Sequence, residues 1–104
     1  MLAEIESQLQ DDILHFGWLC QIAKDHCPSF TDSEIVDCVS DAVTHLAKDR
    51  VIVIGDAAER NGIVQIQPWT TPAETLSARI AEAVTGSTHR EFCFWIQLTK
   101  HYAT

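Results

Sequence analysis

The sequence predicts an α+β fold in which helices cover a small antiparallel sheet, with the element order α-α-β-β-α-β. Three observations lead to this prediction: a β-hairpin pattern in the middle of the chain, two amphipathic helical patterns before it, and a capped helix with an apolar strand after it. With 104 residues, 46% of them apolar, the chain is sized for a single domain over residues 1–104 with a core of its own.

The predicted hairpin spans Val51 to Trp69. Two short β-branched runs, 51–54 and 63–69, flank a polar loop that ends in Asn61-Gly62. Because this loop is longer than a two-residue turn, we expect Asn61 and Gly62 to supply left-handed backbone conformations near its end. A strand pair this short is not stable alone in water, so a helical layer is expected to bury one of its faces.

A first helix is expected from about Ala3 to His26. Apolar residues recur there in steps of three and four and form one stripe, made of Leu2, Ile5, Leu9, Ile13, Phe16, Cys20 and Ala23. Four further apolar residues widen the stripe in the second half, which is therefore expected to be largely buried: Leu14, Trp18, Leu19 and Ile22. Cys27-Pro28 ends the helix, because the residue before a proline disfavours helical geometry.

A second helix begins at a capping box, Thr31-Asp32-Ser33-Glu34, in which the Thr31 and Glu34 side chains satisfy each other's backbone amides. Its buried face is expected to comprise Ile35, Val36, Val39, Ala42, Val43 and Leu46. The opposite face carries Asp37, Asp41, Thr44 and Lys48. This face has two interpretations, a solvated helix surface or a docking surface for a basic partner.

A third helix is expected to start at Thr71-Pro72-Ala73-Glu74, where a threonine cap, a proline and a glutamate follow in the favoured order. Gly86 is expected to end it. After the polar stretch 87–90, residues Glu91 to Thr99 form the last predicted strand, which is apolar on both faces. Such a strand is usually central or covered, so we expect it to pair with the hairpin in a three-stranded sheet.

The charge balance is strongly acidic. Seven basic residues stand against fifteen acidic ones, which gives a formal net charge of −8. Such a field repels nucleic acid and acidic membranes and attracts basic partners. Acidic balance also serves solubility alone, so the charge by itself does not establish that a partner exists.

The composition predicts a cytoplasmic protein without a membrane segment. No apolar run approaches transmembrane length, and Glu4 and Glu6 stand where a signal peptide carries cations. Four cysteines lie mostly within apolar patterns, which is typical of reduced core thiols: Cys20, Cys27, Cys38 and Cys93.

No motif for catalysis, metal or cofactor binding is present. The chain has no glycine-rich phosphate loop and no local nucleophile signature. Cys20 with His26-Cys27 lacks the paired two-residue spacings of a zinc site. Gly55-Asp56 after a strand is typical of an aspartate that bonds its own loop backbone. We therefore expect a protein that is not an enzyme and has no metal or cofactor.

The segment from the second helix onward resembles the helix–strand–wing–strand part of winged-helix domains, through Leu46–Arg50, Val51–Asp56 and a wing-like loop to Trp69. From about Thr31 to Thr99 the chain is similar to small acidic bacterial winged-helix-like proteins that carry a helix before the last strand. The matching residues are Gly55-Asp56, Gly62, Trp69, Pro72, Glu74, Arg79-Ile80, Trp95 and Leu98-Thr99. Some small acidic proteins of this kind are immunity proteins that neutralise toxins of contact-dependent growth inhibition or polymorphic-toxin systems. The resemblance thus implies a winged-helix-like fold and an immunity function.

Winged helices are also known as DNA readers, so a DNA-binding transcriptional regulator is the alternative. A reader needs cations on its recognition helix and wing to contact phosphates. The second helix offers Lys48, followed by Arg50, and the wing offers Arg60 beside two acids. A net charge of −8 opposes the approach of DNA over a Debye length of about 8 Å. Nucleic acid is therefore not the expected partner, unless a dimer gathers Lys24, Arg79 and Arg90.

Binding of a basic protein fits the charge better, because toxins that cut nucleic acid carry basic clefts that an acidic protein can block. The candidate contact residues are Asp37 and Asp41 on the second helix and Asp56 and Glu59 on the wing. Trp69, at a strand end, is a candidate aromatic anchor, although a core position beneath the third helix is the favoured interpretation. A small structural or assembly subunit is a third class, and the sequence leaves the oligomeric state open.

Overall fold

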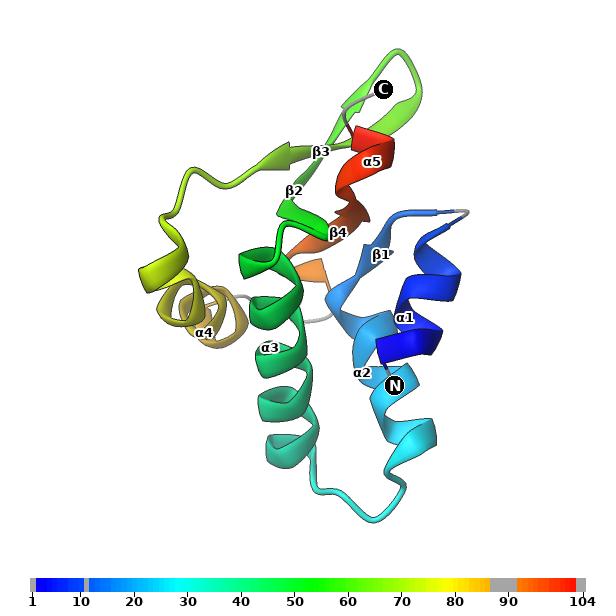
Figure 1. The fold of residues 1–104 in the computed structure, drawn as a ribbon, viewed down its shortest axis with the longest axis vertical. Helices are drawn as coiled ribbons and strands as arrows, with labels where there is room; N and C mark the ends of the chain where they lie inside the picture. Colours follow the sequence, from blue (N-terminus) through cyan, green and yellow to red (C-terminus); the bar gives the residue numbers. More distant parts are fainter. Residues whose placement is uncertain (1, 11, 87–91, 103–104) are drawn as a thin grey trace.

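The computed structural model describes residues 2–10, 12–86 and 92–102. It shows an α+β protein (Figure 1), whose elements in order are α1 (Leu2–Leu9), β1 (Leu14–His15), α2 (Phe16–His26), α3 (Asp32–Lys48), β2 (Ile52–Arg60), β3 (Ile63–Pro68), the 3-10 turn η1 (Ala73–Thr75), α4 (Leu76–Gly86), β4 (Trp95–Leu98) and α5 (Thr99–Tyr102). The predicted order α-α-β-β-α-β is matched approximately. The differences are β1, which divides the first helix, and α5, which follows the last strand.

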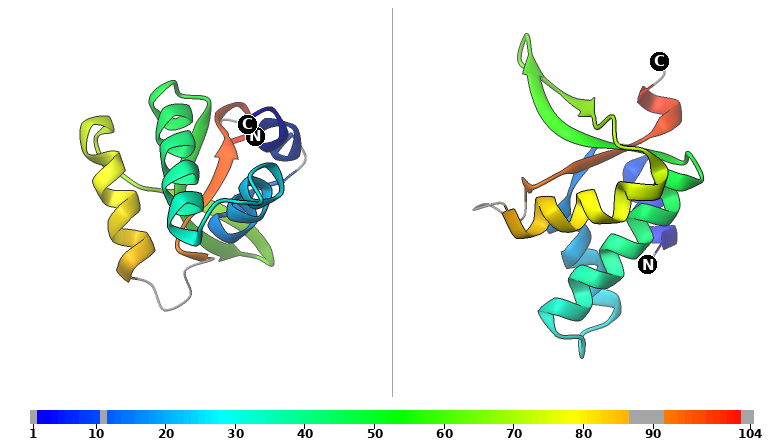
Figure 2. Two further views of the ribbon diagram at one scale, coloured as in Figure 1. Left: turned by 90° about the horizontal axis from the view of Figure 1, so that it is seen from below. Right: turned by 90° about the vertical axis from the view of Figure 1, so that its left-hand side faces the viewer.

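The four strands form one antiparallel sheet in the order β1-β4-β2-β3. Side chains alternate across it, and the inward set is buried against α1–α4 on one face (Figure 2): Leu14, Ile52, Ile54, Ile96 and Leu98. The expectation of a central last strand is confirmed, because β4 lies between β1 and β2. The sheet has four strands rather than three because β1 adds to the other side of β4.

Helix α3 agrees with its prediction. The Thr31 hydroxyl accepts from the Glu34 amide at 3.2 Å, and the Glu34 carboxylate accepts from the Thr31 amide at 3.0 Å, so the capping box is complete. The pKa of Glu34 is lowered because its carboxylate accepts hydrogen bonds from Thr31, from the backbone amide first and from the side chain second. The buried face is the predicted one, except that Val36 is only partly buried: Ile35, Val39, Ala42, Val43 and Leu46.

The continuous first helix predicted from Ala3 to His26 is wrong. The chain leaves helical geometry after Leu9, forms β1, and starts α2 at Phe16. Side chains supply the local hydrogen bonds at this break: Asp12 Oδ1 accepts from the Ile13 amide at 2.8 Å, and His15 Nδ1 accepts from the Trp18 amide at 3.2 Å. Pairing of Leu14 and His15 with β4 then holds the break extended.

Helices α1 and α2 are joined by two side-chain hydrogen bonds. The Trp18 indole donates to the Gln8 side chain, and His26 bonds to the Glu4 carboxylate. Trp18 and His26 are two turns apart on α2, and their partners follow in the opposite sense on α1. The two helices are therefore antiparallel neighbours.

The predicted eight-residue hairpin loop is also wrong. Strand β2 continues through Arg60, and Asn61-Gly62 alone forms the turn, with φ of 54° and 79°. This is the two-residue turn that Asn-Gly favours between antiparallel strands. Strand β4 pairs with β2 only up to Gly55, so residues 56–60 and 63–67 form a two-stranded ribbon that projects from the sheet (Figure 2).

Both ends of β2 carry a residue in the left-handed region. Before it, Arg50 has φ of 60° and ends α3 in a Schellman motif: its amide donates to Ala47 O at 3.1 Å, and the Val51 amide donates to Leu46 O at 2.9 Å. Glycine is the usual residue at this position, and an arginine there bears the steric cost of its Cβ. The Thr99 hydroxyl donates to Arg50 O at 2.8 Å and ties the corner to the end of β4.

The third helix and last strand follow the prediction in part. The 3-10 turn η1 precedes α4, whose residues Leu76, Ile80 and Val84 are buried, and the helix ends at Gly86 as expected. The predicted polar stretch 87–90 and the predicted strand start at Glu91 lie outside the described residues. Regular strand geometry begins only at Trp95, and Phe92 is exposed rather than aligned with Phe94.

Candidate functional site

Two of the predicted contact residues lie on the solvent face of α3. Asp37 and Asp41 are one helical turn apart, and both are exposed. Lys48 is the only lysine or arginine within α3, and it lies almost two turns beyond Asp41. The exposed face of α3 therefore presents a pair of carboxylates with no cation beside them on the helix.

The other two acids lie on the projecting ribbon. Asp56 pairs across the ribbon with Gln67, and Glu59 pairs with Val64; both acids are exposed. Because they are three positions apart on a strand, their side chains point to opposite faces of the ribbon. They can contact one partner only if that partner surrounds the ribbon or approaches its edge.

The structure does not bring the four acids into one cluster. The molecule is 40 Å along its longest axis, with the start of α3 toward one end and the ribbon tip toward the other (Figure 1). Asp37 lies eleven residues before the end of α3, which places it about 16 Å along the helix from that end. The acids thus define two separate surfaces, one on α3 and one on the ribbon.

Trp69 occupies the core position that the sequence analysis favoured over an exposed anchor. It is partly buried, packs against the core, and meets Phe94 edge to face with ring centroids 5.9 Å apart. The guanidinium carbon of Arg79 on α4 lies 4.0 Å from the centre of its ring. Its indole nitrogen is buried and has no hydrogen-bond partner among the described residues. Trp69 therefore lies beneath α4 and is largely covered.

An exposed aromatic surface was missed by the sequence reasoning. Phe92 stacks on Trp95 with ring centroids 6.1 Å apart, and the His15 ring lies 4.8 Å from Phe92 and 5.1 Å from Trp95. Trp18, expected to be buried, is 44% exposed. The break between α1 and α2 is the reason, because it fixes α2 by burying Phe16, Leu19 and Ala23 and leaves Trp18 at the boundary. Recognition of β1 would have placed His15 beside Trp95.

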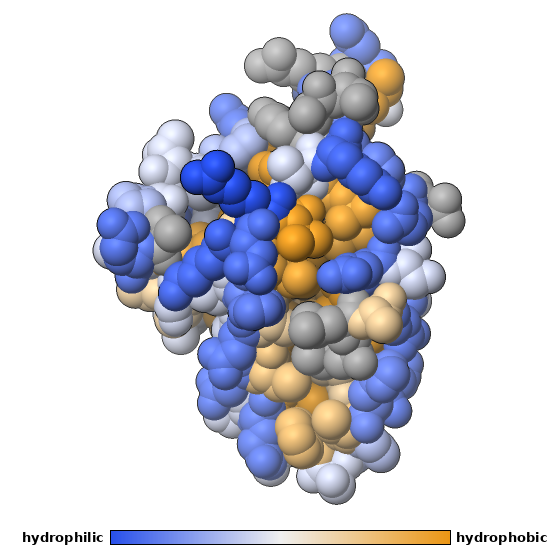
Figure 3. All heavy atoms as spheres, in the orientation of Figure 1, coloured by the Kyte–Doolittle hydropathy of each residue, from blue (hydrophilic) through white to orange (hydrophobic). Residues whose placement is uncertain are grey.

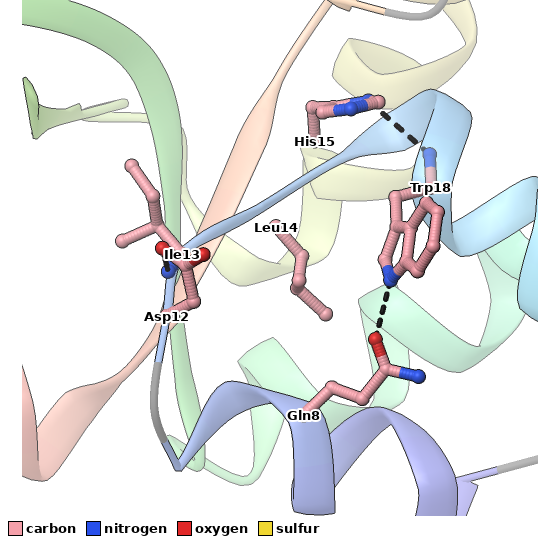
Figure 4. A pocket seen from close by; sticks show the side chains of 6 residues that line it. All are labelled: Gln8, Asp12, Ile13, Leu14, His15 and Trp18. Carbon is pink, nitrogen blue, oxygen red and sulfur yellow. Dashed lines mark hydrogen bonds between the residues drawn. The ribbon is translucent and has the colours of Figure 1, made fainter.

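A pocket of about 400 Å³ opens next to this aromatic surface (Figure 4). It lies between the segment that leads into β1 and the two neighbouring helices, and its lining residues are Gln8, Asp12, Ile13, Leu14, His15 and Trp18. Figure 4 shows Asp12 and Ile13 on one side and Gln8 and Trp18 on the other. The pocket thus combines an indole, an imidazole, a carboxylate and an amide.

Within the described part of the chain, a second pocket brings two basic residues together. Arg50 and Lys100 line a pocket of about 320 Å³ together with Glu6 and Thr99. On the face of Figure 1, apolar side chains fill the seam between α3 and the α1–α2 pair, and hydrophilic side chains border the seam (Figure 3). The pocket with Arg50 and Lys100 also contains the Glu6 carboxylate, and no row of cations continues from it along α3.

No protein-family model, curated protein or solved structure matches the chain. Within residues 2–10, 12–86 and 92–102, no group of three or more His, Cys, Asp or Glu side chains is placed to hold a metal ion. No helix in that part of the chain has the length and apolar character needed to cross a bilayer.

Proposed function

We propose that the protein is an immunity protein that binds a basic protein, a nuclease toxin domain, and masks its active cleft. One observation carries the proposal. Asp37, Asp41, Asp56 and Glu59 are exposed and make no hydrogen bond or ion pair with any described residue. Carboxylates in this state are available to an external cation without the loss of an internal contact.

Five other acids have partners within the fold. Glu34 completes the capping box of α3, Asp25 accepts from Gln21 at 3.0 Å, and Asp49 lies 3.3 Å from His45. Asp12 accepts from the Ile13 amide at the break between α1 and α2, and Glu4 on α1 bonds to His26 on α2. Glu74 and Glu82 are also exposed and make no side-chain hydrogen bond or ion pair with a described residue. We therefore assign the two pairs on α3 and the ribbon to the partner because of where they lie, and not because they alone lack an internal contact.

The proposed mechanism is electrostatic steering followed by occlusion. A net charge of −8 accelerates the approach of a cationic cleft, and long-range attraction acts mainly on the association rate. The ribbon projects from the sheet and carries Asp56 and Glu59 on its two faces, so it can enter a cleft with a carboxylate toward each wall. Asp37 and Asp41 then meet cations on the rim.

A DNA-binding regulator is the second candidate, because the ribbon follows α3 as a wing follows a recognition helix. The charges on these elements favour the first candidate. Cations make the strongest phosphate contacts, whereas the exposed positions of α3 before Lys48 include Asp37 and Asp41, which repel phosphates. Arg50 and Lys100 would supply two contacts at most, beside Glu6.

The test compares charge reversal at the proposed surface with the same reversal elsewhere. We expect Asp37→Lys/Asp41→Lys to slow association with the toxin domain encoded beside this gene by about tenfold or more at low ionic strength. Glu74→Lys/Glu82→Lys is the matched control, since both glutamates are exposed on η1 and α4 and the net charge changes equally. Equal slowing by the two double variants would remove α3 from the interface. Tight, sequence-dependent mobility shifts with DNA at low salt, or no toxin gene beside this one, would contradict the immunity proposal.

A further inference from the structure

The pocket between α1, β1 and α2 has a fixed shape before any ligand arrives. The Trp18 indole N–H donates to the Gln8 side-chain oxygen, which holds the indole plane against α1. The His15 ring is held from two sides, by its cap on the Trp18 amide at 3.2 Å and by its contacts with Phe92 and Trp95. Leu14 lies at the floor and is buried. A preformed pocket of this kind binds with a reduced ordering cost.

The chemistry of its walls selects a cation. The indole of Trp18 is 44% exposed and offers a negative π face. The exposed Asp12 carboxylate uses Oδ1 to accept from the Ile13 amide at 2.8 Å, and a carboxylate has further acceptor positions on both oxygens. The whole chain adds a charge of −8.

Among cations, the pocket fits a guanidinium better than an ammonium. A guanidinium is planar, stacks on an aromatic face, and donates in a fork to a carboxylate, whereas an ammonium is a compact and strongly hydrated point charge. A volume of about 400 Å³ accommodates the planar head and part of the aliphatic stem.

We propose that this pocket binds an arginine side chain of the basic partner, with the guanidinium between the Trp18 indole and the Asp12 carboxylate. The inference rests on the proposed function for the identity of the partner. It assigns the anchoring contact to a site away from the acids of α3 and the ribbon. Those acids set the rate of approach, and the pocket holds one side chain in place, as central anchors do at protein interfaces.

The experiment follows the three indole N–H signals in ¹H–¹⁵N NMR spectra while N-acetyl-arginine amide is added to the full chain. We expect the Trp18 signal to shift with saturation, while N-acetyl-citrulline amide, a neutral molecule of the same shape, leaves it in place. Asp12→Asn keeps an oxygen for the Ile13 amide, so the fold is retained, and we expect it to weaken arginine binding about tenfold. Glu82→Gln on α4 makes the same charge change away from the pocket and is expected to weaken binding less than about twofold.

Three results would contradict the proposed arginine site. They are no shift of the Trp18 indole signal with the arginine compound, an equal shift with the citrulline compound, or equal weakening of arginine binding by Asp12→Asn and Glu82→Gln. The last result would show that arginine binding depends only on the net charge of the protein. This titration needs no toxin, so it separates the pocket from the proposed function. A chain that binds arginine at Trp18 and captures no basic toxin would refute the function only. If Asp12→Asn bound the toxin with the affinity of the parent chain, the assignment of the pocket as the anchoring contact would be refuted, and the immunity function would not.

Discussion

The part of the sheet that lies against the helices and the ribbon that projects from it contain similar β-branched residues in different surroundings. Ile54 and Ile96 pair across β2 and β4 and are 7% and 0% exposed. On β3, Ile63 and Val64 are 61% and 50% exposed, and only Ile66 is buried. The first region is stabilised by burial of side chains, whereas the second depends on its backbone ladder and its Asn-Gly turn.

The difference indicates which substitutions each region tolerates. Truncation of a side chain should be costly in the helix-backed sheet and nearly neutral at the exposed positions of the ribbon, such as Ile63 and Val64. Substitutions that alter backbone geometry should be costly on the ribbon as well. Side chains with little role in stability are available to a partner, which agrees with the placement of Asp56 and Glu59 there.

The largest effect is expected for Phe94→Ala. Phe94 is fully buried between Phe16, at a centroid distance of 5.1 Å, and Trp69, at 5.9 Å, so truncation leaves a cavity. We expect the free energy of unfolding in urea to fall by about 3–5 kcal/mol. Ile63→Ala on the ribbon is the contrast and should cost less than about 0.5 kcal/mol. Similar losses for the two variants would mean that the ribbon has a core of its own.

A smaller but still large effect is expected for Gly55→Ala, at the point where β2 leaves β4. A Cβ at this position would lie 2.1 Å from the carbonyl oxygen of Gln67 on β3, so the two strands would have to separate. We expect a loss of about 2 kcal/mol or more in thermal unfolding, with faster amide exchange along the ribbon. Gly86→Ala is the control, because a Cβ there meets nothing within 4 Å. An unchanged stability of Gly55→Ala would show that the ribbon moves away from the sheet at no cost.

The third prediction concerns the corner that leads into β2. Arg50 has φ of 60°, so Arg50→Gly should stabilise the protein by about 0.5–1 kcal/mol through relief of the Cβ strain. Gly62→Ala, at φ of 79° on the other end of β2, should do the opposite by a similar amount. Both are measured by urea unfolding. A loss of stability in Arg50→Gly would assign a structural role to the arginine side chain.

The smallest effect is a dependence of stability on pH at the start of α3. Thr31 lowers the pKa of Glu34, so the charged carboxylate stabilises the folded chain above the ordinary pKa of a glutamate. This contribution is lost as the pH falls through the lowered pKa of the folded state. Glu34→Gln keeps a capping side chain without the titration, so its unfolding midpoint should change less between neutral and acidic pH than that of the parent chain. Parallel curves for the two proteins would contradict the assignment.

The elements that the sequence predicted well are those whose signals are local. The capping box at Thr31 and Glu34 and the three- and four-residue apolar steps after it placed α3, and Gly86 placed the end of α4. The Asn-Gly pair located the hairpin turn. The polar residues before it were mistaken for loop because the ribbon is exposed on both faces, which leaves no apolar alternation to mark a strand.

Features that depend on distant contacts could not be predicted. The apolar steps through Leu9, Ile13 and Phe16 continue across the break between α1 and α2, and only pairing with β4 makes β1 a strand. The acids Asp37, Asp41, Asp56 and Glu59 were correctly expected at the surface, but their separation follows from the length of α3 and the projection of the ribbon. Trp18 was expected in the core because its position was counted along one continuous helix, whereas α2 is a separate helix with its own buried face.

The central position of β4 has a consequence for the order of events as the chain is made. Strand β1 at residues 14–15 and the inner half of β2 share β4 as their partner, so neither edge of that strand can be paired until residues 95–98 have left the ribosome. Closing β4 onto β1 also joins segments about eighty residues apart, which is slow because of the entropy of the intervening chain. Until then the apolar faces of α2 and α3 lack the complete sheet that covers them in the folded chain. The nascent chain should therefore depend on chaperones, or on rapid emergence of β4, to avoid aggregation.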